Sequence, residues 1–210
     1  MRKVRKKFNL VMVMLCIIVL LVPAPIQAKS EKSKMKALVN QLEIYEWELL
    51  ARGMKKVKLS NREIAEAAAL SIHVLKDHKK TEFGEYTQYK ISDKEVKNAA
   101  KNMFGKKAGI KQLRKNPKEE DKRYFDAYRL KDGTAVVDYG EMETDTDYIV
   151  NSVSVKKNKK DVFTLTKKVY FGYWGVQTKK SNYKITYKLK NTKKSKYGYI
   201  IKAITVSEIK

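Results

Sequence analysis

The chain has 210 residues, of which 47 are lysine or arginine and 23 are aspartate or glutamate, giving a formal net charge of +24. A single cysteine excludes an internal disulfide and a site built from several cysteine ligands. The charge favours anionic partners, because a strongly basic surface attracts polyanions.

The first 28 residues have the composition of a secretory signal peptide. A basic segment ending at Lys7 precedes an uninterrupted apolar run, Leu10–Val22, and Ala28 then supplies a small residue. This order of parts predicts export and cleavage after Ala28. The alternative is an uncleaved anchor, but a membrane-spanning helix needs about 20 apolar residues, and the run stops at Pro23 before that length.

Cys16 lies inside the apolar run and follows Leu15, where a lipoprotein signal needs a small residue. We therefore expect no lipid anchor at this position. The mature chain, residues 29–210, would hold no cysteine, which excludes disulfides and thiol catalysis. An exported, lysine-rich chain without disulfides suggests a Gram-positive bacterium. Its length suits one domain with a hydrophobic core.

Helical patterns begin after the signal segment. Apolar residues recur at three- and four-residue steps from Ser30 to Met54, which predicts a first helix. Ser60–Glu63 is a capping-box pattern, so a second helix should start there and end near Lys79. Its face of small residues predicts that the two helices pack as a hairpin.

A third helix follows a segment that the pattern leaves open. Thr81–Lys90 fits either a short strand or an ordered loop. Ser92–Glu95 is a second capping box, and Gly105 stands in the usual stop position, so a helix is predicted between them. Lys106–Lys118 is a basic connector with a turn around Ile110–Leu113.

The second half has the pattern of a β-meander. In Tyr183–Leu189 apolar and polar residues alternate, as in a strand with one dry and one wet face. Asp132-Gly133 predicts a two-residue hairpin turn with positive φ at both positions. The predicted strands are Tyr124–Leu130, Thr134–Glu143, Tyr148–Val155 with a turn through Lys156–Lys160, Val162–Phe171, Tyr183–Lys190 and Tyr197–Val206.

Four carboxylates alternate at Glu141, Glu143, Asp145 and Asp147. On a continuous strand they would share one face, about 6.6 Å apart, and clustered oxygen ligands can bind calcium. Their spacing does not match an EF-hand loop. A solvated turn, partly neutralised by lysines, is the simpler interpretation, so we predict no metal site here.

The chain has two histidines, His73 and His78. On a helix they would point about 140° apart, which does not suit a shared metal ion. No Gly-x-Ser-x-Gly motif and no phosphate-binding Gly-x-x-x-x-Gly-Lys-Ser/Thr loop occurs. We therefore predict no catalytic residue and no cofactor.

The best candidate for a binding loop is Gly172–Gly175, which holds Tyr173 and Trp174. Exposed aromatic rings between glycines can stack on sugars or insert at a membrane interface. The alternative is that Trp174 folds back onto the sheet as a lid.

Lysine is concentrated at the C-terminal end, where Ile149–Lys210 holds 16 lysines against two acidic residues. Such a field favours wall teichoic acid, anionic lipid head groups or nucleic acid. Export and the excess of lysine over arginine make nucleic acid the least suitable of these. The alternative is that lysine only solvates the surface. The candidate binding lysines, on the predicted wet face, are Lys184, Lys188 and Lys190.

The order of helices and then strands resembles that of cystatin-like or nuclear-transport-factor-like domains. The resemblance covers Met35–Ile209 in layout and rests mainly on the Ser92–Gly105 helix followed by the meander. The chain also resembles small exported proteins of unassigned function from Gram-positive anaerobes. No family motif transfers a catalytic residue, so the resemblance implies shape rather than activity.

We therefore expect a signal peptide, residues 1–28, and one secreted α+β domain, residues 29–210. Residues 29–118 should be mainly helical and residues 119–210 a β-meander, so that helices pack on a curved antiparallel sheet of about five to six strands.

The expected function is non-enzymatic attachment of the lysine face to an anionic cell-wall polymer or to lipid head groups at the cell surface. Tyr173 and Trp174, or the concave face of the sheet, would add selectivity. One alternative is an enzyme with a pocket in that concave face, using Asp, Glu and Tyr for acid–base work. Another is a membrane-anchored extracellular scaffold that retains Leu10–Val22. The pattern does not indicate an oligomeric state.

Overall fold

The helices follow the apolar patterns of the first half of the chain, with one more break than predicted. The computed structural model describes residues 30–72, 80–83, 86–118, 123, 125–139, 146–173 and 175–209. The described α-helices are α2 (Glu31–Asn40), α3 (Glu43–Ala51), α4 (Asn61–Ile72) and α5 (Asp93–Phe104).

The predicted helix Ser30–Met54 is two helices, because the chain turns at Gln41 and Leu42. The backbone N–H of Leu42 donates to the carbonyl of Val39, at 3.0 Å, in place of a continued α-helical bond. The turn lets each helix bury its own apolar face. Met35, Leu38 and Val39 are buried on α2, and residues 45–50 are buried on α3.

The capping box predicted at Ser92 forms in full, whereas at Ser60 only the side-chain half of the predicted box forms, because the Ser60 N–H donates to the carbonyl of Lys58. The Ser92 side chain accepts from the N–H of Glu95, whose carboxylate accepts from the N–H of Ser92, and Gly105 ends α5 at φ +68°. The Ser60 hydroxyl accepts from the N–H of Glu63 at 3.2 Å, at the start of α4. These local contacts are set by neighbouring residues, which is why the pattern locates them.

The strands form two sheets, where a single sheet was predicted. Sheet A has the order β1-β10-β9-β8-β7, all antiparallel, and among the described strands β7 is an edge strand that pairs with β8. Its strands are β1 (Lys56–Val57), β7 (Thr146–Lys159), β8 (Val162–Tyr173), β9 (Tyr183–Asn191) and β10 (Tyr199–Glu208).

Sheet B has the order β2-β3-β6-β5-β4 and takes in the segment whose structure the pattern leaves open. A short 3-10 helix, η2 (Ile110–Gln112), precedes β4, which runs parallel to β5. The strands are β2 (Lys80–Phe83), β3 (Tyr86–Ile91), β4 (Arg114–Lys115), β5 (Phe125–Arg129) and β6 (Ala135–Tyr139). The predicted α+β class is thus confirmed, with a second sheet added.

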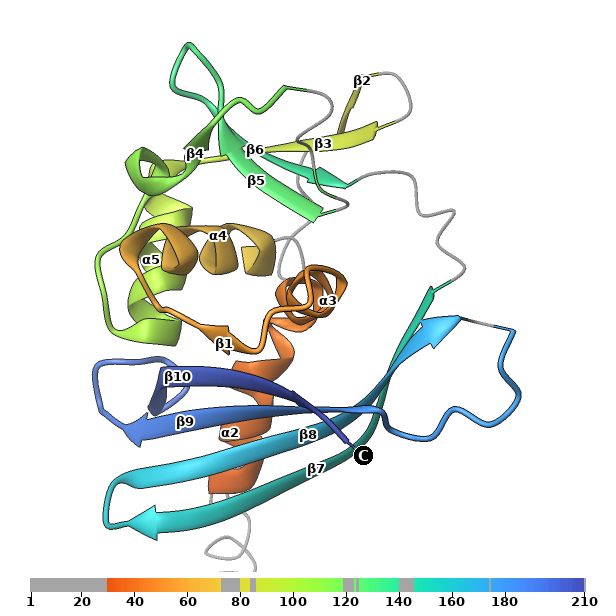
Figure 1. Cartoon of the computed structure of the whole chain (residues 1–210). Coiled ribbons are helices and arrows are strands. Elements are labelled where there is room, and N and C mark those ends of the chain that lie inside the picture. The colour runs from red at the N-terminus through yellow and green to blue at the C-terminus, as the bar shows by residue number, and fades with distance from the viewer. Residues whose placement is uncertain are drawn as a thin grey trace, which may run out of the picture. The chain divides into compact units, whose positions relative to one another are not determined.

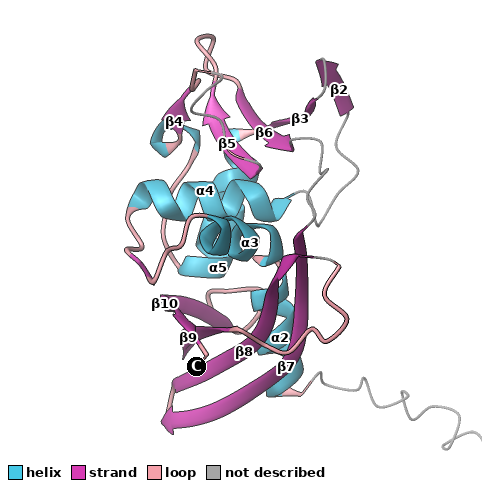
Figure 2. Cartoon of the chain, turned by 45° about the vertical axis from the view of Figure 1, so that its right-hand side comes forward, coloured by secondary structure: helices cyan, strands magenta, loops and turns pink. Residues whose placement is uncertain are grey.

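In Figure 1, α3, α4 and α5 lie between the two sheets, and α2 lies behind sheet A. In contacts between elements, α4 meets β5 of sheet B, while α5 and α2 meet β10 of sheet A. Figure 2 shows the same layers after a 45° turn, with α2 against sheet A. One continuous core joins the layers, because the inward side chains of both sheets pack on the same helices. On the opposite face of sheet A, the described lysines Lys168, Lys184 and Lys188 are exposed.

The hairpin at Asp132-Gly133 forms, but with a different turn from the one predicted. Only Gly133 has a positive φ, +86°, and no described residue other than glycine does. The N–H of Leu130 donates to the carbonyl of Thr134, and the carboxylate of Asp132 accepts from the N–H of Thr134. The loop is thus longer than two residues, and Asp132 contributes its side chain rather than a left-handed backbone.

Several predictions fall on residues outside the described part of the chain. They concern the signal peptide, the two histidines, Glu141 to Asp145, and Trp174.

Candidate functional site

The outer face of sheet A is built by the alternation that the sequence shows in β9. Ile185, Tyr187 and Leu189 are fully buried against the helices, whereas Lys184 and Lys188 between them are exposed. The period of two in a strand puts these two sets on opposite faces of the sheet. The predicted dry and wet faces of this strand are confirmed.

The strand register extends this pattern across the whole sheet. Residues paired across neighbouring strands lie side by side on one face, so three continuous rows cross it. The rows are Ser207–Lys184–Lys168–Ser152, Lys56–Thr205–Thr186–Thr166–Ser154, and Ala203–Lys188–Thr164–Lys156. We call these positions the lysine–hydroxyl face. They comprise lysines, serines, threonines and one alanine, and no carboxylate.

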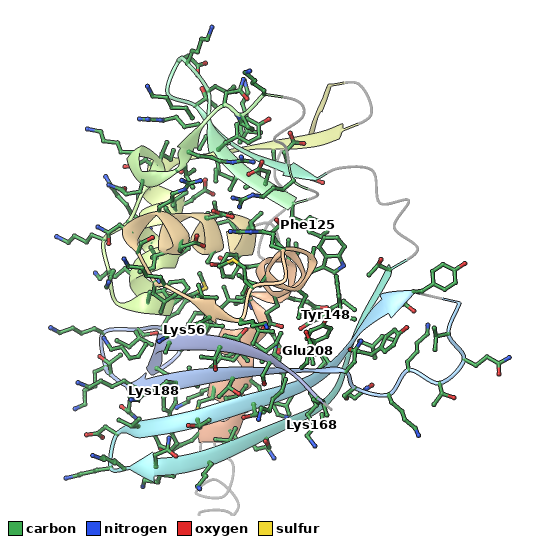
Figure 3. All side chains as sticks on the ribbon, viewed as in Figure 1. Lys56, Phe125, Tyr148, Lys168, Lys188 and Glu208 are labelled. Carbon is green, nitrogen blue, oxygen red and sulfur yellow. The ribbon has the colours of Figure 1, made fainter. Side chains whose placement is uncertain are left out.

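The five lysines of this face come from four strands that are distant in sequence. Lys56 stands on β1, Lys156 on β7, Lys168 on β8, and Lys184 and Lys188 on β9. Figure 3 labels Lys56, Lys168 and Lys188 on sheet A, and by register they share the face opposite the buried Ile185, Tyr187 and Leu189. None of the five forms an ion pair with a residue that the structure describes.

Lys168 and Lys184 are cross-strand partners in the register of β8 and β9. Their Cβ atoms are therefore roughly 5 Å apart, and like charges in this arrangement destabilise a sheet. Several other pairs on the face place a lysine beside a hydroxyl, as in Lys188 beside Thr164, and the middle row pairs hydroxyls with one another. The face thus concentrates positive charge and keeps hydroxyl donors between the ammonium groups.

The structure brings together three of the five predicted binding residues. Lys184, Lys188 and Lys190 are exposed on the same face of β9, where Lys190 lies beyond the last of the three rows, opposite Val162. Tyr173 is 56% exposed at the far end of β8, and by alternation it falls on the other side of that strand. The loop residue Trp174 is not among those described.

Sequence reasoning missed Lys56, Lys156 and Lys168 as members of this face. A signal was present for Lys168, because Thr164, Thr166 and Lys168 alternate with the apolar Phe163 and Leu165. Lys56 could not be found in this way. Its strand has two residues, too few to show a period, and joins the sheet only through pairing with β10.

Lys167, the neighbour of Lys168, points inward and is 1% exposed. Its ammonium lies 2.8 Å from Oε1 and 2.9 Å from Oε2 of Glu46, a residue with no exposed surface, and 3.4 Å from the carbonyl of Val39. The hydroxyls of Tyr148 and Tyr187 also donate to Glu46. Every donor of the ammonium is therefore matched by a protein acceptor.

This buried cluster ties β7, β8 and β9 to α3. Burial, followed by the Glu46 carboxylate, raises the pKa of both Tyr148 and Tyr187 above the usual range of tyrosine. Both hydroxyls are therefore neutral donors committed to Glu46 and are not available as bases. The arrangement positions the strands, and nothing in it requires a substrate.

A cavity of about 330 Å³ lies beside this cluster, between α3, β5 and β7. Its walls include Trp47, which packs edge-to-face on Phe125 with ring centroids 5.0 Å apart. Figure 3 shows Phe125 and Tyr148 near α3. The lining residues are Glu43, Ile44, Trp47, Phe125, Thr146, Asp147 and Tyr148. Of the carboxylates here, Asp147 is paired with Lys179.

A second charged cluster joins α3 and α4 below sheet B. Arg123 pairs with the buried carboxylate of Glu66 and lies 3.9 Å from Glu48, and Arg52 reaches Glu66 at 3.5 Å. Burial raises the pKa of Glu48 to about 7, although Arg123 acts in the opposite direction. The pKa of Glu66 is raised as well, again chiefly by burial. These groups fix Arg123 against the helices.

Within the described residues, no group of three or more His, Cys, Asp or Glu side chains could hold a metal ion. None of the helices that the structure describes has the length and apolarity needed to cross a bilayer. Comparison with family models, curated proteins and solved structures gave no match to this chain.

Proposed function

We propose that the protein is exported and binds, without catalysis, to a phosphate-rich anionic polymer of the cell wall through the lysine–hydroxyl face. The observation that carries this proposal is the pairing of Lys168 with Lys184, two like charges side by side with no carboxylate partner among the described residues. Such a pair costs free energy in the free protein. A bound anion between the two ammonium groups would turn that cost into attraction.

The chemistry of the face supports a phosphodiester chain. Lysine ammonium groups act as point charges that suit repeated phosphates, with less geometric demand than arginine forks. The threonine and serine hydroxyls between them can donate hydrogen bonds to the same oxygens. Wall teichoic acid belongs to this chemical class. A polymer several units long could contact all three rows at once, which adds avidity.

The same face is less suited to a lipid surface. Insertion at a membrane interface uses exposed aromatic and aliphatic side chains. The three rows contain lysine, serine, threonine and alanine only. Of the exposed large apolar residues, Tyr173 and Val176 lie at or beyond the end of β8. We therefore favour the wall polymer over lipid head groups.

We further propose that sheet A and α2 form a cystatin-like arrangement, in which a curved antiparallel sheet wraps a helix. The contacts of α2 with β10 and the buried inward face of β9 support this. In this proposal the chain loses residues 1–28 on export from a Gram-positive cell, and the wall polymer meets the convex face.

The test is retention of the purified protein on cell-wall sacculi, with and without teichoic acid, across a salt series. If all five lysines contact phosphates, affinity should fall by about three and a half orders of magnitude per tenfold rise in salt, taking about 0.7 released counterions per contact as for single-stranded nucleic acid. Retention that ignores salt, or that persists without teichoic acid, would overturn the proposal.

Two triple variants and a comparison with lipid vesicles make this test more specific. The triple variant Lys168→Gln/Lys184→Gln/Lys188→Gln should lower the salt slope by about 2. The control Lys94→Gln/Lys107→Gln/Lys111→Gln removes the same charge from exposed positions elsewhere and should change the slope much less. Vesicles containing anionic lipid form the second arm. Equal binding to vesicles and sacculi would point to lipid head groups instead.

An enzyme remains the second candidate, and the cavity beside Tyr148 is the observation that favours it. Acid–base work there would rest on Glu43 and Asp147, because the hydroxyl of Tyr148 donates to Glu46. If the protein releases soluble fragments from sacculi and Glu43→Gln abolishes the release, the enzyme is supported. No release would leave the binding function as stated.

A further inference from the structure

A basic cavity lies at the end of sheet B, on different strands from the lysine–hydroxyl face. It has a volume of about 490 Å³. Its lining residues are Lys115, Asn116, Arg129, Leu130, Lys131 and Gly133. Three of these six are cationic, and none is acidic.

The backbone around the cavity is held by hydrogen bonds on both sides. β4 pairs in parallel with β5, so that Lys115 is the register partner of Arg129. The N–H of Asn116 donates to the carbonyl of Arg129 at 2.8 Å, and the N–H of Gly133 donates to the carbonyl of Leu130 at 3.1 Å. The positions of the three cations are therefore set by paired strands and a closed turn.

The two faces of sheet B differ in how their cations are paired at this end. Arg114 precedes Lys115 and reaches across to Asp126, with Nε 3.1 Å from Oδ1. By strand alternation Lys115 and Arg129 lie on the opposite face from that pair. Neither they nor Lys131 forms an ion pair with a described residue. Like charges in register cost stability unless an anion lies between them.

We infer that this cavity binds a phosphate monoester or inorganic phosphate. Arg129 supplies a planar fork that can donate two parallel hydrogen bonds to phosphate oxygens. Lys115 and Lys131 add two charges, and the side-chain amide of Asn116 adds a neutral donor. The volume leaves room for the organic group that carries the phosphate. This site stands independently of the proposed wall-polymer function.

The experiment is a calorimetric titration of the purified protein at low salt with two probes, inorganic phosphate and glycerol 3-phosphate. Arg129→Gln should weaken binding by about tenfold or more, because it removes charge-assisted hydrogen bonds. Arg129→Lys should fall between Arg129→Gln and the parent, since the charge stays and the fork is lost. Tighter binding of the ester would show that the organic group is recognised, and equal binding that phosphate alone is.

Controls separate this site from general charge and from the proposed function. Arg62→Gln removes an exposed arginine of α4 and should leave phosphate binding unchanged. Lys131→Gln should also weaken phosphate binding. Because Lys131 is an exposed turn residue, this change should not unfold the protein. The triple variant on sheet A should keep phosphate binding, and Arg129→Gln should keep retention on sacculi. Absence of binding by both probes, or equal weakening by Arg62→Gln, would overturn the inference.

Discussion

Lys167 of β8 and Glu46 of α3 form an ion pair in the protein interior, 121 residues apart in sequence, with the ammonium 2.8 Å from the nearer carboxylate oxygen. Transfer of two charges out of water is costly, and here the cost is offset because the ammonium and both carboxylate oxygens have hydrogen-bond partners. It holds sheet A to the helix that also contacts sheet B through β5.

Breaking this pair on one side should strongly destabilise the fold. We expect Lys167→Met to lower the free energy of unfolding by about 3–5 kcal/mol, because it leaves the Glu46 carboxylate buried and uncompensated. In the double variant Glu46→Leu/Lys167→Met the loss should be partly recovered. Recovery stays partial since the hydroxyls of Tyr148 and Tyr187 lose their acceptor. Urea unfolding of both single variants and the double variant checks this, and strictly additive losses would contradict it.

Stability should fall as pH rises from about 4.5 to about 7. Burial raises the pKa of Glu48 from its ordinary value of 4.5 to about 7, so in this window the folded state holds a proton that the unfolded state has released. The raised pKa of Glu66 acts in the same direction. A proton held only by the folded state makes stability decrease with pH.

The variant Glu48→Gln, which cannot ionise, should flatten this part of the stability curve. The parent and variant should differ by a few kcal/mol at most at the upper end, because one pKa unit is about 1.4 kcal/mol. Thermal unfolding at several pH values measures the difference, with Glu208→Gln as an exposed control. A slope that is the same in parent and Glu48→Gln would show that Glu48 is ionised in the folded protein at these pH values.

The capping box of α5 should contribute measurably to stability. Ser92→Ala removes the acceptor for the N–H of Glu95 and should lower the free energy of unfolding by about 1 kcal/mol. Lys94→Ala, an exposed change in the same turn, should have a much smaller effect. Denaturant midpoints of the two variants test this, and equal shifts would argue against the cap.

Lys168→Gln should separate stability from binding. Removing one of two adjacent like charges should stabilise the free protein at low salt by about 0.2–1 kcal/mol. The same change should weaken retention on sacculi and lower the salt slope. Lys101→Gln on α5 serves as the control, since it removes an exposed lysine on the helix layer. A variant that is less stable and binds equally well would contradict both parts.

Mass spectrometry of protein recovered from the culture medium or cell surface should show a chain that begins at Lys29. A mass that includes Leu10–Val22 would instead support the membrane-anchored scaffold. Because the two forms differ by 28 residues, the result does not depend on high mass accuracy.

The sequence predicts best what neighbouring residues decide. The caps at Ser60 and Ser92, the stop at Gly105 and the two faces of β9 all follow from short spacings, and all are present. The three predicted lysines of β9 share one exposed face for the same reason. Their role as a binding site stays a prediction.

What depends on distant partners could not be predicted. The division into two sheets follows from which strands pair, and β3 joins β6 across more than 40 residues of chain. A lysine is typical of the solvent-exposed face of a strand, so the sequence gives no sign that Lys167 is buried. Its pairing with Glu46 is what makes it part of the core. The places of Lys56 and Arg129 likewise depend on pairing with β10 and β4, which residues adjacent in sequence do not indicate.

Among the described residues, the outer edge of the 14-residue strand β7 has no neighbouring strand, and it is lined by the exposed residues Lys156, Lys157 and Lys159. Charged side chains, lysine above all, are how natural sheets discourage edge-to-edge aggregation. That protection is electrostatic, and its range shrinks from about 8 Å at physiological salt to about 3 Å at 1 M. Concentrated salt therefore removes the repulsion that keeps copies of the protein apart, so preparations should be returned to low salt before they are concentrated.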